Sequence, residues 1–114
     1  MAHDQSELLQ GTLELMILKT LSLEPLHGWG ISLRIRQASK DVFQVNQGSL
    51  YPALQRMKSR GWIRSEWRTT EHNRRARYYV LTPAGVRKLA QERAQWERSM
   101  TAVNWVLDPS GGAA

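Results

Sequence analysis

Apolar residues recur every three or four positions between residues 6 and 22, which predicts a first helix over that range. A second apolar face on this helix carries Leu8 and Leu15. A helix with two apolar faces often packs its own core on one side and a partner on the other, so we expect Leu8 and Leu15 to face a partner. The stripe expected to face the core comprises Leu9, Leu13, Met16, Ile17 and Leu21.

A second helix is predicted over residues 28–39, after a break at residues 25–28, and a third helix follows it. Asn46 can cap the third helix, and Gly61 suits the position just after its end. Pro52 then lies beyond the first turn, where its ring removes one helical hydrogen bond. We therefore expect either a distorted first turn or a later helix start.

Two strands are predicted to follow. Residues 62–70 alternate in polarity as a half-exposed strand does, and residues 75–81 are expected to return beside them. Residues 71–73 suit the turn, in which Asn73 can adopt a positive φ. Trp67 is expected to pack in the sheet.

The last helix is expected to run over residues 83–107, with Thr82 as its N-cap. Its apolar residues repeat with alternating spacings of three and four, which is typical of a helix that packs along another helix. A single arginine interrupts this seam. The seam comprises Val86, Leu89, Arg93, Trp96, Met100, Val103 and Leu107.

The predicted order is helix, helix, helix, strand, strand, long helix. This indicates an α+β, mostly α fold: a winged helix-turn-helix with a two-stranded wing and a long C-terminal dimerisation helix. We expect a DNA-binding domain over residues 6–82, a dimerisation helix over 83–108 and a disordered tail over 109–114.

The net charge of +6 is unevenly distributed. Residues 34–77 hold 11 Lys/Arg against 3 Asp/Glu, a local net charge of +8, whereas the rest of the chain has a net charge of −2. A basic segment of this kind favours a polyanionic partner. Charge alone leaves a solvated basic face open as the alternative.

Several classes of function are excluded by composition. There is no cysteine, which excludes disulfides, thiolate metal sites and cysteine nucleophiles. The histidines lack ligand spacing, and no catalytic constellation occurs, so we predict no metal, no cofactor and no enzyme. Acidic residues near the start argue against a secretory signal, and no apolar run approaches the ~20 residues of a membrane span. A cytoplasmic protein with no membrane partner is expected.

The third helix and the hairpin carry residue types that bind DNA. Short or planar polar side chains can hydrogen-bond to base edges, and Tyr51 or Pro52 can contact a thymine methyl. The hairpin arginines can bind phosphates, although strand alternation lets only two of the three share a face. The alternatives are a solvated helix face and a hairpin whose arginines merely solubilise a sheet edge. The candidate DNA-binding residues are Gln47, Ser49, Tyr51, Pro52, Gln55, Lys58, Asn73, Arg74, Arg75 and Arg77.

Five short motifs, in order and at matching spacings, resemble PadR-family transcriptional regulators, in particular the short members with a single C-terminal helix. The resemblance covers roughly residues 8–108. Two positions differ near the expected DNA-facing surface: Trp29 stands where the family usually has Tyr, and Asn73 where it usually has Gly. The motifs are GTLEL at 11–15, LHGWGI at 26–31, GSLYPAL at 48–54, GWI at 61–63 and RRARYYVLTPAG at 74–85.

The resemblance implies a dimeric repressor that binds a partly palindromic double-stranded DNA operator and is released by a small molecule. Some relatives bind planar aromatic compounds between paired tryptophans at the dimer interface, and Trp96 occupies the matching position. A filled hydrophobic dimer core is the alternative for Trp96. The alternative for the whole chain is a ligand-sequestering or protein-binding winged-helix module without an operator. The predicted dimer interface comprises Leu8, Leu15, Leu89, Arg93, Trp96, Met100, Val103 and Leu107.

Overall fold

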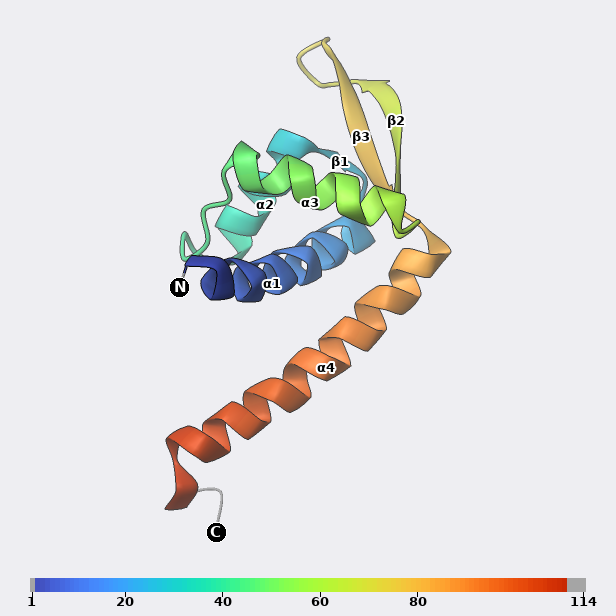
Figure 1. Cartoon of the computed structure of the whole chain (residues 1–114). Helices are drawn as coiled ribbons and strands as arrows, with labels where there is room; N and C mark the ends of the chain where they lie inside the picture. The colour runs from blue at the N-terminus through green and yellow to red at the C-terminus, as the bar shows by residue number, and fades with distance from the viewer. Residues whose placement is uncertain (1, 111–114) are drawn as a thin grey trace.

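Three helices form a body from which a β-hairpin projects on one side, while a long C-terminal helix leaves on the other (Figure 1). The computed structural model describes residues 2–110, with side chains from residue 11 onward. The predicted winged helix-turn-helix with a long C-terminal helix is confirmed. The elements are α1 (Ala2–Leu23), β1 (Leu26–His27), α2 (Gly28–Ala38), α3 (Gln47–Ser59), β2 (Ile63–Thr69), β3 (Arg75–Leu81) and α4 (Pro83–Leu107).

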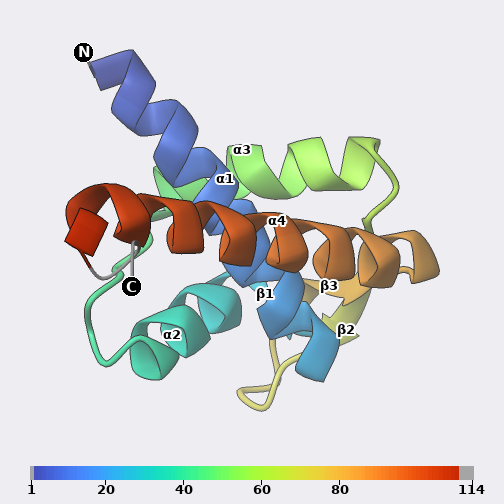
Figure 2. The same ribbon diagram turned by 90° about the horizontal axis from the view of Figure 1, so that it is seen from below.

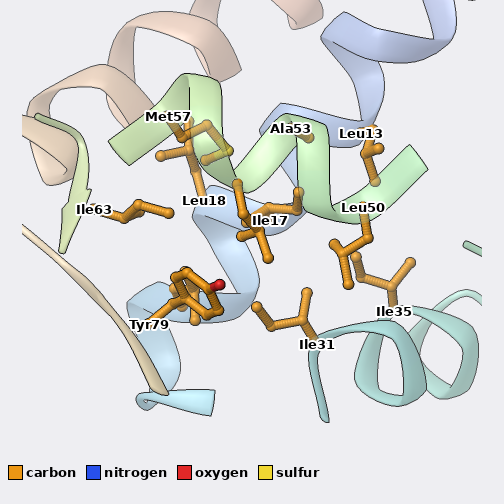
Figure 3. Packing of buried hydrophobic residues seen from close by; sticks show 12 residues of the cluster. Leu13, Ile17, Leu18, Ile31, Ile35, Leu50, Ala53, Met57, Ile63 and Tyr79 are labelled. Atoms are coloured by element: carbon orange, nitrogen blue, oxygen red, sulfur yellow. The ribbon is translucent and has the colours of Figure 1, made fainter. Parts of the chain in front are cut away.

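One apolar core joins α1, α2, α3 and the sheet (Figure 3). The buried face of α1 follows the predicted stripe, except that Leu18 is also buried and Met16 is only half-buried. Leu9 lies outside the described side chains. Truncation of a fully buried leucine in such a core costs about 2–5 kcal/mol. The buried residues are Leu13, Ile17, Leu18, Leu21, Ile31, Ile35, Leu50, Ala53, Leu54, Met57, Ile63 and Tyr79.

Both ends of α3 are specified locally. Asn46 Oδ1 accepts a hydrogen bond from the Ser49 backbone N–H at 2.8 Å, so the predicted N-cap is confirmed and the later start is wrong. The helix is continuous through Pro52, which leaves the Gly48 carbonyl without its helical donor. Gly48 is solvent-exposed, so water can satisfy this carbonyl. Gly61 follows the helix with φ of 77°, the left-handed conformation that glycine adopts without strain.

The sheet has a third strand that the sequence did not predict. The expected break at residues 25–28 contains β1, which pairs antiparallel with β3 and gives the strand order β1-β3-β2. Its two residues pair with Tyr78 and Tyr79, more than fifty positions away, and local patterning cannot reveal such a pairing. His27 then caps α2, because its Nδ1 accepts the Gly30 N–H at 3.0 Å.

The hairpin turn and the start of α4 follow the sequence closely. Asn73 has φ of 61°, as expected for its place in the turn. Thr82 Oγ1 accepts the Gly85 N–H at 3.0 Å, and Pro83 occupies the first turn of α4, where a missing N–H costs nothing. Seen from below, α4 crosses α1 and packs on it near its own start (Figure 2).

Candidate nucleic-acid interface

The exposed surface of α3 divides into two edges. Gln47, Tyr51, Gln55 and Lys58 follow one another at intervals of three or four residues and therefore form one stripe. Ser49 and Pro52 lie on the other edge, beside α1, where they line a hollow of about 450 Å³ with Thr12, Leu13 and Arg56. The predicted reading residues are all exposed, but they do not share a single face.

The hairpin presents two of its three arginines on one face. Arg75 and Arg77 stand opposite Thr69 and Trp67 in the ladder, so their side chains point to the same side of the sheet. Arg74 belongs to the turn that precedes β3. This arrangement matches the expectation that only two of the three arginines can share a face.

The prediction that Trp67 packs in the sheet is wrong. Its side chain is 54% exposed, because the hairpin extends beyond the helical body and this part of its face has no helix beneath it. The opposite face of the hairpin holds an acidic residue, Glu66, between Arg64 and Arg68. Hydrogen bonds from Arg64 and Arg68 lower the pKa of the Glu66 carboxyl below its ordinary value.

A cleft of about 580 Å³ separates α3 from the hairpin and brings part of the predicted site together. Tyr51 lines it from α3, and Arg74, Arg75 and Arg77 line it from the hairpin. Gln55 and Lys58 lie outside the cleft, farther along α3. The remaining lining residues are His27, Gly28, Trp29, Thr70, Glu71, His72, Ala76 and Tyr79.

Tyr51 lies on the floor of this cleft with its phenol packed against Gly28. A Cβ atom on Gly28 would stand 2.7 Å from the Tyr51 hydroxyl oxygen, so only a glycine allows the phenol this position. Tyr79 is buried behind it. Burial raises the pKa of the Tyr79 phenol, the neighbouring Tyr51 raises it further, and Arg77 partly offsets the rise.

Trp29 is a surface residue that the sequence analysis left out of the site. Its side chain is 63% exposed and lies between the cleft and a second hollow of about 360 Å³, which Gln47 also lines. The Gln47 amide donates to Ser32 Oγ at 3.3 Å, which ties α3 to α2 at this hollow. The sequence feature that could have indicated an exposed Trp29 is its position between Gly28 and Gly30 at a predicted helix start.

An ion-pair cluster fixes α3 against α1. Glu14 Oε2 accepts from Arg56 Nε at 3.1 Å, and Glu14 Oε1 lies 3.9 Å from Arg60 Nη1. The Glu14 side chain is only 13% exposed. Since a partly buried carboxylate that has lost its cationic partner is costly, this pair restricts how α3 can move relative to α1.

The seam of α4 is largely exposed. Leu89 packs on the core, and Met100 is half-buried. Beyond Leu89, a groove of about 440 Å³ runs between α1, α2 and α4, with Trp96 at its α4 wall. Leu8 lies outside the described side chains. The exposed seam residues are Val86, Arg93, Trp96, Val103 and Leu107.

The hairpin, the cleft and the polar helix beside it are the parts of a DNA-binding winged helix. A family model described as the transcriptional regulator PadR-like family matches residues 17–91, more than half of the chain. The chain belongs to this PadR-like family. A transcriptional regulator of Mycobacterium tuberculosis is 31% identical over 91 residues, which cover 80% of this chain and 81% of that protein.

Solved structures agree with the PadR-like assignment. A PadR-like transcriptional regulator from Bacillus cereus superposes with a TM-score of 0.76 at 28% identity, covering 90% of this chain and 97% of that one. A transcriptional regulator from Clostridium thermocellum superposes with a TM-score of 0.77, also at 28% identity, covering 86% of this chain and 92% of that one.

Membership of the PadR-like family decides the general function. The chain is a DNA-binding transcriptional regulator and not an enzyme. Within residues 2–110, no helix is long and apolar enough to cross a membrane.

Proposed function

We propose that this PadR-like regulator is a dimeric repressor of a partly palindromic operator, with α3 in the major groove and the hairpin on the phosphate backbone. The observation that carries the proposal is the shared cleft, to which α3 contributes Tyr51 and the hairpin contributes Arg74, Arg75 and Arg77. In such a complex the helix in the groove reads the base sequence, and the cations on the flanking phosphate backbone position the protein on the DNA.

The contact residues are assigned by their position. Gln47 and Gln55 share the exposed edge of α3 with Tyr51, which lines the cleft, and these three side chains read base edges. Lys58 at the far end of this edge binds phosphate. Ser49 and Pro52 contact the backbone or a thymine methyl from the other edge. Asn73 shapes the turn through its positive φ, and its exposed side chain can contact the phosphate backbone beside Arg74.

A second copy of the chain covers the α4 seam. Exposed apolar side chains at alternating spacings of three and four have no cover in the described part of the chain, and an apolar seam of this kind packs along another helix. Leu15, half-buried on α1, lies at the same groove as Trp96 and extends the apolar surface. A two-fold dimer would place two α3 helices on one face, as a palindromic operator requires.

A planar aromatic effector bound beside Trp96 would release the DNA. Phe43 and Met16 line both the groove at Trp96 and the hollow at the start of α3. Phe43 belongs to the segment before α3, in which Lys40 and Asp41 have φ of 53° and 67°, a conformation that costs energy for residues other than glycine. A ligand that displaces Phe43 would therefore act on α3 directly, in addition to changing the spacing of the two subunits.

Footprinting on the DNA upstream of the chain's own gene tests operator binding. We expect a protected palindromic site with half-sites about one helical turn apart. Arg75→Ala should weaken binding to all DNA sequences alike. Gln47→Ala should instead reduce the ratio of the affinity for the operator to the affinity for random DNA. Arg98→Ala, on α4 outside the cleft, is the matched control for lost positive charge. Binding that barely responds to salt would contradict the proposal and favour a protein- or ligand-binding module.

The dimer and effector steps have their own tests. Val103→Glu on the seam should convert the dimer into a monomer in light scattering, while Val106→Glu, exposed but off the seam, should not.

The dye 8-anilinonaphthalene-1-sulfonate is a suitable probe of the groove. Dye binding should be lost in Trp96→Ala but kept in Trp105→Ala, because Trp105 is exposed on α4 and does not line the groove. The bound dye should lower DNA affinity. Dye binding that leaves DNA affinity unchanged contradicts the effector step.

A further inference from the structure

Trp67 is an exposed aromatic residue in the middle of the basic face of the hairpin. The guanidinium carbon of Arg77 lies 4.9 Å from the centroid of its ring, and that of Arg75 lies 5.4 Å from it. Both distances are within the range of cation–π attraction. The ladder explains the grouping, because Trp67 stands opposite Arg77 and diagonal to Arg75 on one face of the sheet.

The geometry leaves both arginines able to bind a further anion. In the described part of the chain, no carboxylate lies within ion-pair distance of Arg75 or Arg77; Glu66 is on the opposite face with its own two arginines. A guanidinium held on an aromatic ring uses its flat face, so the N–H groups at its edge stay available. One edge group of Arg77 donates to Ser65 Oγ at 2.9 Å, which restricts that side chain further.

We propose that Trp67 is a positioning residue for DNA binding: its indole ring holds Arg75 and Arg77 in the orientation in which they bind phosphate. The proposal rests on the proposed contact between hairpin and DNA, and it assigns to Trp67 the ordering of the arginines rather than a contact with bases. A free arginine loses considerable rotamer entropy when it binds. An arginine already ordered on the ring loses less, so the ring raises affinity without touching the DNA.

Arg74 provides an internal comparison. It lines the same cleft from the turn, but it makes no ring contact with any described residue. If Trp67 orders only the two arginines beside it, the contribution of Arg74 to DNA affinity should not depend on the residue at position 67.

A mutant cycle on a mixed-sequence duplex of about 30 base pairs at low salt tests the proposal without knowledge of the operator. Trp67→Leu should weaken binding roughly 5- to 30-fold, and Trp67→Phe, which keeps an aromatic face, should lose less than about 3-fold. In the Arg75→Ala/Arg77→Ala background, Trp67→Leu should cause no further loss. In the Arg74→Ala background its effect should be undiminished.

The salt dependence supplies a second readout that a merely structural role would not produce. Arg77→Ala should reduce the slope of log affinity against log salt by about one, whereas Trp67→Leu should leave the slope unchanged because both cations are still present. If Trp67→Leu melts at a lower temperature, Trp67→Thr replaces it, since threonine favours a strand and has no ring.

Two outcomes overturn the proposal. An equal loss from Trp67→Leu with and without the two arginines would mean that the indole contacts DNA itself. An unchanged affinity in Trp67→Leu, with Arg75→Ala and Arg77→Ala still harmful, would mean that the arginines need no ordering. If the arginine variants themselves bind as the parent does, the contact between hairpin and DNA fails instead.

Discussion

The phenol of Tyr51 on α3 lies directly against the backbone of Gly28 at the start of α2. A Cβ atom at Gly28 would stand 2.7 Å from the Tyr51 hydroxyl oxygen and 3.0 Å from its Cζ. The contact couples the two helices of the helix-turn-helix at the floor of the cleft. Glycine at this position therefore serves the placement of a neighbouring side chain, since no positive φ is involved.

Gly28→Ala should displace Tyr51 and weaken DNA binding while leaving the fold stable. The tyrosine ring can swing toward solvent, and alanine favours a helix, so the free energy of unfolding should change by less than about 1 kcal/mol. Loss of one hydrogen bond to DNA predicts roughly 3- to 10-fold weaker binding. Titration of a labelled duplex measures the affinity, and urea unfolding measures the stability.

Gly30→Ala is the matched control, because its Cβ would meet its neighbours at 3.4 Å, an ordinary packing distance. It should bind DNA as the parent does. If Gly28→Ala weakens binding equally in a Tyr51→Ala background, the effect does not act through the tyrosine and the interpretation is wrong.

Gly85→Ala should destabilise the junction between the hairpin and α4. A Cβ there would stand 2.1 Å from the Trp62 carbonyl oxygen and 2.6 Å from Leu81 Cδ1. The first of these is a backbone atom, whose position is also fixed by a 3.0 Å hydrogen bond from the Thr82 N–H, so no side-chain rotation relieves the clash. We expect a loss of about 1–3 kcal/mol in the free energy of unfolding, measured in urea.

Gly11→Ala controls for the general effect of replacing a helical glycine. Nothing lies within 4 Å of its Cβ position, so this variant should gain about 0.5–1 kcal/mol from helix propensity. Equal effects of the two substitutions would mean that the junction tolerates a methyl group.

The elements of this fold were predictable where a single residue determines a boundary. Asn46, Gly61 and Thr82 act through their own side chain or backbone, and the helices begin and end where these residues require. The hairpin turn followed for the same reason, because Asn73 tolerates a positive φ. Local chemistry of this kind does not depend on the rest of the chain.

Features set by distant pairing were not predictable. β1 has only two residues and exists because β3 offers it a partner. The alternation of β2 indicates which residues share a face with Trp67, but not whether that face meets a helix or water. The hairpin projects beyond the helical body, and Trp67 on it is exposed. The arginines beside it become apparent only once the strand register is known.

The residue types of the site could be predicted from the sequence, but not which of these residues lie together in one hollow. Every predicted DNA-binding residue is exposed, yet Tyr51 faces the hairpin while Ser49 and Pro52 face α1. Helical spacing separates Tyr51 from Ser49 and Pro52, but only the packing of α3 decides which side meets the hairpin and which meets α1. The resemblance placed Trp29 near the DNA-facing surface, but its place at the cleft depends on the same packing.

Tyr79 should make stability fall at alkaline pH. Burial raises the pKa of its phenol above the ordinary value of 10, so the folded state holds the proton more tightly than the unfolded state. The stabilising contribution is complete below about pH 10 and is lost as the pH rises through the pKa of the folded state. Tyr79→Phe should reduce this decline in urea unfolding, and Tyr78→Phe, on the opposite face, serves as the control. Equal declines in all three proteins would contradict the assignment.

Glu14→Gln should loosen α3 from α1 more than the loss of an exposed ion pair would. The Glu14 carboxylate is bound by Arg56 at 3.1 Å and its side chain is 13% exposed, whereas the side chain of Glu92, which pairs with Lys88 on α4, is 39% exposed. We expect Glu14→Gln to cost about 1–2 kcal/mol of unfolding free energy, and Glu92→Gln less than about 0.5 kcal/mol. Because Glu14 links α1 to Arg56 on α3, hydrogen exchange along α3 should also accelerate in Glu14→Gln but not in Glu92→Gln. Unchanged exchange together with unchanged stability would show that core packing alone holds α3 in place, and that this ion pair has no part in positioning the helix.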